Sequence, residues 1–132
     1  MAGKIIADTL EHSTAGSIAT NYVVNGSAKA WILQTNNATD FSTRDSFNCS
    51  ATTDNADGDT TYTISSAMSN DDFVVVHGVG DNANQDKFCA NLTQADGSQT
   101  STTQFRVTSR DISTGSYGSV ASHGSCVMGD LA

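Results

Sequence analysis

Three histidines and three cysteines are the residues of this chain best suited to binding a metal. They are spread along the sequence without a C-x-x-C pair or a histidine spaced to complete one, so no zinc motif is present. The three histidines are too far apart in sequence to claim a metal site, which leaves a histidine trio formed in a threefold assembly as the alternative. We expect no metal and no cofactor. We expect the cysteines to be reduced thiols buried in the core. These residues are His12, His77, His123, Cys49, Cys89 and Cys126.

Aspartate supplies thirteen of the fourteen acidic residues and could act as a general acid or base. Such catalysis needs a carboxylate in a desolvated cleft, whereas aspartate in turn sequences hydrogen-bonds to its own backbone. The run at residues 54–59 is similar to a calcium loop, but Ala56 and Ser65 occupy the places of two ligands. No G-x-S-x-G nucleophile motif is present. We therefore predict no catalytic residues. The aspartates in predicted turns are Asp54, Asp57, Asp59, Asp71 and Asp72.

Length and composition indicate one small β domain. The chain has 132 residues and a net charge of −8, which disfavours nucleic acid and anionic membranes as partners because both need a cationic surface. Serine, threonine and asparagine favour turns and strands over helices, and they make up a third of the sequence. We predict an all-β fold.

Segments of alternating apolar and polar residues, separated by polar turns, predict an antiparallel β-sandwich, jelly-roll-like in form. Residues 22–34 should form a strand, a turn and a second strand, with Trp31 as a core anchor. Residues 34–42 are expected to be a loop, residues 43–52 one strand, and residues 73–79 a central strand covered on both faces. The residues expected in the core are Trp31, Phe47, Tyr62, Ile64, Phe73, Val75, Phe88 and Phe105.

The domain organisation follows from the distribution of apolar residues. We assign residues 1–16 to an N-terminal arm and residues 17–132 to the β-sandwich domain. The arm carries an apolar run with no obvious partner in the chain, and we predict that Ile5, Ile6 and Leu10 attach the protein to a larger assembly. The polar loops should present recognition surface. The loop residues assigned to recognition are Asn36, Asn37, Asp40, Asn82, Asn84 and Asp96.

Four stretches carry a family resemblance: KIIADTLEHSTAG, YVVNGSAKAW, RDSFNCSATTDNADGDTTYTISSAMSNDDFVVV and VMGDLA. Together they resemble small tail-fibre-type virion proteins of tailed bacteriophages, particularly marine ones. The AKAW segment and the spacing from DSFN through DN to YTI are the most specific parts. The resemblance implies a homotrimeric, mainly β, non-enzymatic virion component.

Two roles on a virion fit this resemblance. The first is a short tail fibre or receptor-binding tip, whose partners would be other copies of the chain, other phage virion proteins, and a host cell-surface glycan or protein. The alternative is a capsid decoration protein that stabilises the head lattice. In either role we expect the protein to be made in the host cytoplasm, to reside in the virion, and to bind neither nucleic acid nor membrane.

Overall fold

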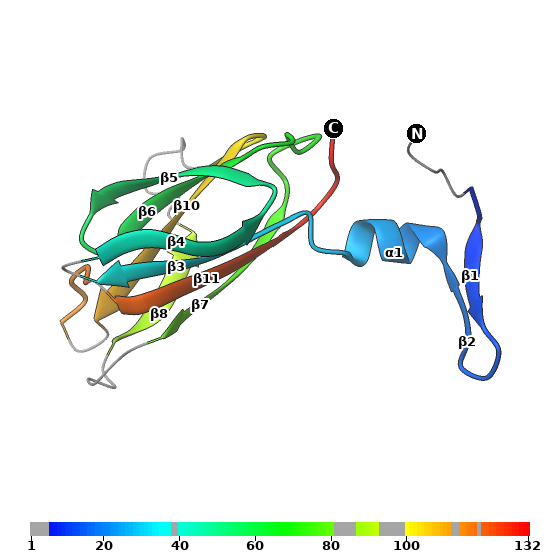
Figure 1. Cartoon of the computed structure of the whole chain (residues 1–132), viewed down its shortest axis with the longest axis horizontal. Coiled ribbons are helices and arrows are strands. Elements are labelled where there is room, and N and C mark those ends of the chain that lie inside the picture. The colour runs from blue at the N-terminus through cyan, green and yellow to red at the C-terminus, as the bar shows by residue number, and fades with distance from the viewer. Residues whose placement is uncertain (1–5, 38–39, 81–86, 93–99, 112–113, 119) are drawn as a thin grey trace.

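The computed structural model describes residues 6–37, 40–80, 87–92, 100–111, 114–118 and 120–132; for His12, Asn37 and residues 87–92 it describes the backbone alone. Antiparallel strands dominate, and the described residues contain one short helix. The elements form a body of two sheets and a smaller N-terminal part that stands apart from it (Figure 1). The prediction of an all-β fold with antiparallel sheets is confirmed.

The body has two sheets with antiparallel pairing throughout. The five-stranded sheet has the order β5 (Cys49–Ala56), β6 (Asp59–Ile64), β10 (Gln104–Asp111) and β8 (Lys87–Leu92), with β9 (Thr100–Ser101) also paired to β10. The four-stranded sheet has the order β4 (Asp40–Phe47), β3 (Ala30–Asn37), β11 (Val120–Met128) and β7 (Val74–Gly80).

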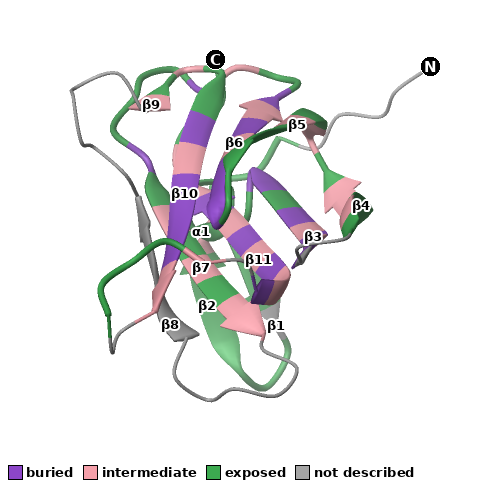
Figure 2. Ribbon diagram, turned by 90° about the vertical axis from the view of Figure 1, so that its left-hand side faces the viewer, coloured by how far each residue is buried: buried purple, intermediate pink, exposed green. Residues whose placement is uncertain are grey.

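The core lies between the two sheets. Side chains alternate between the faces of a strand, and Figure 2 shows buried positions recurring along β3, β10 and β11. Burying one large apolar side chain contributes about 1.5–3 kcal/mol. The buried cluster consists of Ala30, Ile32, Tyr62, Ile64, Met68, Phe73, Phe105, Val107 and Val127. The predictions for Tyr62, Ile64, Phe73 and Phe105 are confirmed, Val75 packs partly buried against the cluster, and the side chain of Phe88 lies outside the described residues.

The chain passes from one sheet to the other at Asn48. Its φ of 55° lies in the left-handed region, which asparagine adopts more readily than most residues. The side-chain amide of Asn48 donates to the carbonyl of Lys29 at 2.9 Å and accepts from the backbone N–H of Ser66 at 2.8 Å. The single strand predicted over residues 43–52 is therefore wrong, because β4 and β5 belong to different sheets. At this corner Phe47 stays on the outer face, 55% exposed, instead of entering the core.

Trp31 also lies on the outer face of the four-stranded sheet, so the prediction that it anchors the core is wrong. It is 36% exposed and pairs directly with Phe47. Its neighbours Ala30 and Ile32 fill the core, and the alternation of the strand then turns Trp31 outward. The predicted loop at residues 34–42 belongs mainly to β3 and β4. The alternation of inward and outward positions there could not be recognised from the sequence, because the inward residues are polar.

The most apolar run of the sequence forms an edge strand, not a central one. Strand β7 lies at the end of the four-stranded sheet, and Val74 and Val76 are exposed on its outer face. Phe73, Val75 and His77 share the covered face, since each of them is more buried than the residue that follows it. The run therefore has one covered face instead of two.

Residues 6–28 form a projecting segment that extends away from the body (Figure 1). Strands β1 (Thr9–His12) and β2 (Gly16–Ala19) pair as a hairpin, and helix α1 (Thr20–Gly26) follows. The arm boundary predicted after residue 16 falls inside this hairpin, because His12 pairs with Gly16. The strand predicted at the start of residues 22–34 is instead part of α1.

Replacement of Asn48 tests the corner between the sheets. Asn48→Ala removes the side-chain hydrogen bonds and leaves alanine, which tolerates positive φ less well than asparagine, at this position. We therefore expect the free energy of unfolding to fall by about 1–3 kcal/mol. Asn48→Gly also loses the amide but tolerates the backbone conformation, and should lose less. Urea unfolding measures both variants. Equal stability of wild type and both variants would refute this role of Asn48.

Candidate functional site

One end of the core is polar. Inward positions there carry hydrogen-bonding side chains in place of aliphatic ones, and we call this group the inter-sheet polar cluster. The two sheets are joined within it, since Asn36 Nδ2 donates to Thr60 Oγ1 at 3.0 Å. Both residues are buried, so the prediction that Asn36 offers recognition surface is wrong. The cluster comprises Gln34, Asn36, Thr60, His77, Ser109, His123, Ser125 and the hydroxyl of Tyr62.

His77 and His123 lie next to each other in this cluster, although they are far apart in sequence. Their ring centroids are 5.1 Å apart in an edge-to-face arrangement. His77 Nδ1 lies 2.5 Å from Ser125 Oγ, while His123 Nε2 lies 3.3 Å from Ser109 Oγ. The third histidine, His12, belongs to β1 of the projecting segment. The structure thus brings two of the three histidines together.

Both imidazoles are held in the neutral form. Desolvation, with a smaller contribution from the adjacent His123, lowers the pKa of His77 to about 3, and burial lowers the pKa of His123 to about 4. Groups with such low pKa values are weak bases near neutral pH. His77 Nε2 and both amide atoms of Gln34 are buried without a hydrogen-bond partner among the described residues. The arrangement is that of a structural network, because within the described residues both rings hydrogen-bond to hydroxyl groups and to no carboxylate.

Asp59 is the one buried member of the aspartates assigned to turns. It begins β6 and forms an ion pair with Arg106 of β10. Burial alone would raise the pKa of Asp59, but hydrogen bonds from Arg106 and Asn55 and the charge of Arg106 outweigh it and leave the pKa lowered. A carboxylate engaged in this way stays ionised and cannot store a proton for catalysis. Asp59 therefore joins two strands of the five-stranded sheet.

The side chains of two of the three cysteines are described. Cys49 and Cys126 are free thiols, as predicted. The prediction that they are buried in the core is wrong for Cys126, which is partly buried beside the exposed Trp31, whereas Cys49 packs partly buried against the core cluster. Burial raises the pKa of Cys49 to about 11, so the thiol is protonated near neutral pH. The side chain of Cys89 lies outside the described residues. Cys49 therefore lacks the low pKa that a nucleophile requires.

The projecting segment is the second candidate site. Lys29, at its junction with the body, donates from Nζ to the carbonyl of Val24 and to Ser27 Oγ at 2.8 Å, which ties the end of α1 to the start of β3. Thr20 ties the other end of α1 to β1, since its N–H donates to the carbonyl of Asp8 at 2.9 Å. The helix is therefore held at both ends, but no residue of it is buried.

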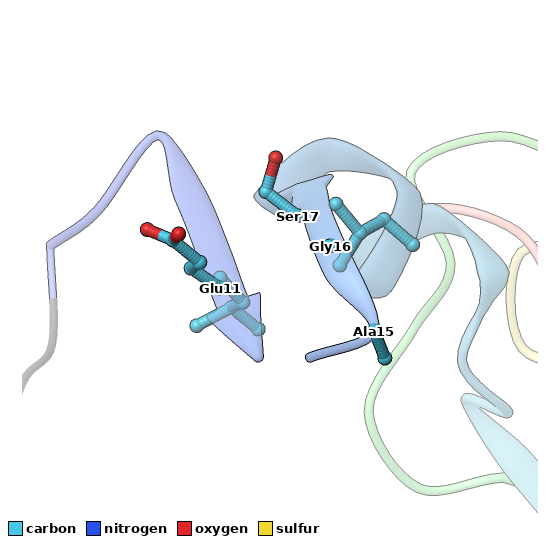
Figure 3. Close-up of a pocket in the computed structure, with 6 residues that line it drawn as sticks. Glu11, Ala15, Gly16 and Ser17 are labelled. Atoms are coloured by element: carbon cyan, nitrogen blue, oxygen red, sulfur yellow. The ribbon is translucent and has the colours of Figure 1, made fainter. Parts of the chain in front are cut away.

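A shallow hollow lies on the hairpin of this segment (Figure 3). Cross-strand partners Leu10 and Ile18 supply its apolar wall, and Glu11 and Ser17 supply its polar edge. Both Leu10 and Ile18 are about half exposed. The hollow is a surface that a partner could cover, and it lies apart from the core of the body.

The predicted site residues are placed as follows. Of the residues predicted to attach the chain, Ile6 is 82% exposed and Leu10 lies on the exposed hairpin, whereas Ile5 lies outside the described residues. Asp40 is exposed at the start of β4, and Asn37 ends β3. Asn82, Asn84 and Asp96 lie outside the described residues. The structure therefore places the described attachment residues on one segment and the described loop residues elsewhere.

Sequence reasoning missed the histidine pair because of a bulge in β11. The register of β11 against β3 shifts between Val120 and His123, and such a shift reverses the alternation of inward and outward residues. Val120, His123 and Val127 are consequently all buried. The period of two along residues 73–79 was the one available signal, since it puts His77 on the same face as Phe73 and Val75.

Similarity to known proteins assigns no function to this chain. No family model, curated protein or solved structure matches this chain. Within the described residues, no group of three or more histidine, cysteine, aspartate or glutamate side chains could hold a metal ion. No helix of the described part has the length and apolar character to cross a membrane.

The histidine pair predicts a specific pH dependence of stability. The folded-state pKa values of about 3 and 4 lie below the ordinary value of 6.5, so the unfolded chain binds more protons between these limits. Stability should be full above pH 6.5 and fall as the pH drops from there toward 4. Urea unfolding at a series of pH values measures this. His77→Gln should flatten the slope by removing one of the two groups, and a wild-type stability that is constant from pH 7 to 4.5 would contradict the prediction.

Proposed function

We propose that this chain is a non-enzymatic structural protein on the outer surface of a tailed-bacteriophage particle, serving as a short tail fibre or receptor-binding tip. The observation that carries the proposal is the projecting segment. It exposes apolar side chains on both the hairpin and the helix while making few contacts with its own body. Exposed apolar surface collected in one place is typical of an interaction site. The virion setting comes from the sequence resemblance.

Attachment is assigned to the projecting segment. Ile6 and Leu10 lie at its N-terminal end, where exposure leaves them open to a neighbouring virion protein. Burial of such side chains against a partner contributes about 25 cal/mol per Å² of apolar surface. The chain has a net charge of −8, and its acidic body would face solvent and the host surface. Exposed polar residues of the body, such as Asp40, would contact a host glycan or protein.

The assembly we propose is a homotrimer of jelly-roll-like sandwiches. The chain crosses between the two sheets at β4 to β5, β6 to β7, β7 to β8 and β10 to β11, and repeated crossing between two packed sheets supports a jelly-roll-like form. Symmetric assembly is the usual way in which a small domain covers apolar surface that it cannot bury alone. Exposed Trp31 and Phe47 are examples of such surface.

Removal of residues 1–27 tests attachment. The described buried residues begin at Lys29, so the truncated chain should keep a cooperative unfolding transition. We expect it to be missing from purified particles, as measured by mass spectrometry of particles assembled in its presence. A matched control is Thr53→Asp, a charge added at an exposed position of β5, which should be incorporated normally. Normal incorporation of the truncated chain would refute attachment through this segment, and its copy number per particle would separate a tail role from capsid decoration.

A further inference from the structure

The exposed apolar residues gather on two surfaces. Twelve large hydrophobic residues are exposed among the described residues, of which six lie on the projecting segment and four on the outer face of the four-stranded sheet. Scattered exposed hydrophobics would need no explanation, but two concentrated surfaces do. The six are Ile6, Leu10, Ile18, Tyr22, Val23 and Val24, and the four are Trp31, Phe47, Val74 and Val76.

The sheet surface is a continuous row across all four strands. Phe47 of β4 pairs with Trp31 of β3, Trp31 pairs with Cys126 of β11, and Cys126 pairs with Val76 of β7. Paired residues on one face of a sheet have neighbouring side chains. We call Phe47, Trp31, Cys126 and Val76 the outer apolar row. The sheet is covered on its inner face by the other sheet, and nothing in the described chain covers this row.

The projecting segment needs a partner for its own stability. Helix α1 has seven residues, none of them buried, and lacks a side-chain hydrogen bond at its N-terminus. An isolated helix of fewer than about 12 residues is marginal in water, and a lone two-stranded hairpin is marginal as well. Adjacent Val23 and Val24, both β-branched, lower the helix propensity further. The segment is therefore an element that is completed by packing against something else.

We propose that the projecting segment of one copy packs, through α1, against the outer apolar row of a second copy. A helix without a sheet and a sheet face without a covering layer are complementary, because a helix on a sheet is a standard pair of layers. The row lies near the end of the body from which the segment leaves, since Trp31 follows closely after Lys29 (Figure 1). A segment leaving that end of one body is therefore placed beside the corresponding end of a neighbour.

The size of the two surfaces favours this pairing over contact between two sheet faces. A stable interface takes roughly 20–30 residues from each partner. When the row packs on its like, both copies contribute only four residues, whereas in the proposed contact one of the two copies contributes the segment of residues 6–28, which is of the required size. The contact joins different surfaces, so copies linked through it form a ring where the rotation closes and an open filament where it does not. That the copies form a ring of three rests on the proposed function, whereas the contact between the segment and the row does not.

The charge of the chain predicts how salt affects the contact. Each copy carries a net charge of −8, so copies repel one another at low ionic strength. Salt screens this repulsion while leaving apolar burial intact. Self-association should therefore strengthen as salt is raised, in contrast to an interface built on ion pairs.

Two single substitutions on the whole chain test the contact. Val24→Asp places a charge on α1, and Val76→Asp places one on the outer apolar row; each should weaken self-association at least about tenfold, since an unpaired charge resists burial. Thr53→Asp on β5 is the matched control. Sedimentation velocity at micromolar concentration measures assembly, and the emission of Trp31, the one tryptophan of the chain, should be blue-shifted in the assembly and red-shifted in the monomeric variants. Urea unfolding checks that each variant is folded.

Mixing the two variants gives the decisive result. Val24→Asp keeps an intact row and Val76→Asp keeps an intact segment, so an equimolar mixture should recover one contact and form a dimer. A contact between two sheet faces predicts no recovery and leaves Val24→Asp assembled, and either result would overturn the proposal. A monomeric wild-type chain, or equal loss of assembly in Thr53→Asp, would overturn it too. Because these measurements use purified protein, they are independent of incorporation into particles.

Discussion

The two-layer arrangement depends on the corner at Asn48. A single residue at positive φ carries the chain between the sheets, and its amide binds the backbone at Lys29 and at Ser66. Asn48 thus joins three parts of the chain at one point, namely the residue before β3, the link between β4 and β5, and the residues after β6. The corner also sets the inside and outside of the body, since Phe47 before it stays on the outer face and Cys49 after it packs against the core.

The core divides into two parts with different energetics. Near the corner it is apolar, with Tyr62 and Phe105 packed at 5.1 Å between ring centroids, and this part supplies most of the hydrophobic stabilisation. The other part holds the inter-sheet polar cluster, where a hydrogen bond contributes only about 1 kcal/mol net and an unpaired buried group costs about 1–3 kcal/mol. That part fixes the relative position of the sheets more than it stabilises them, since His77 and Gln34 each keep unpaired atoms.

The sequence predicted the fold class and about half of the core, and particular residues explain the difference. Tyr62, Ile64 and Phe105 follow unbroken alternation in strands that the sequence identified. Trp31 and Phe47 failed because large apolar residues were assumed to point inward, which is wrong for a sheet face that remains uncovered in the chain. The histidine pair could not be predicted, because it requires both the pairing of β7 with β11 and the register shift before His123. The assignment of attachment residues stays a prediction, made because an apolar run without alternation stands out in a polar chain.

Strand β7 has a further consequence as the edge of its sheet. The opposite edge, β4, is protected against unwanted pairing by exposed Arg44 and Asp45 and by a register shift against β3. Residues 74–80 of β7 are rich in valine, and their one titratable residue, His77, is neutral. This edge therefore lacks the charged residues that protect β4. Extended chains of other molecules can add to such an edge by backbone hydrogen bonding alone. Of the two edges of this sheet, β7 is therefore the one through which the domain would aggregate at high concentration when no partner molecule is bound.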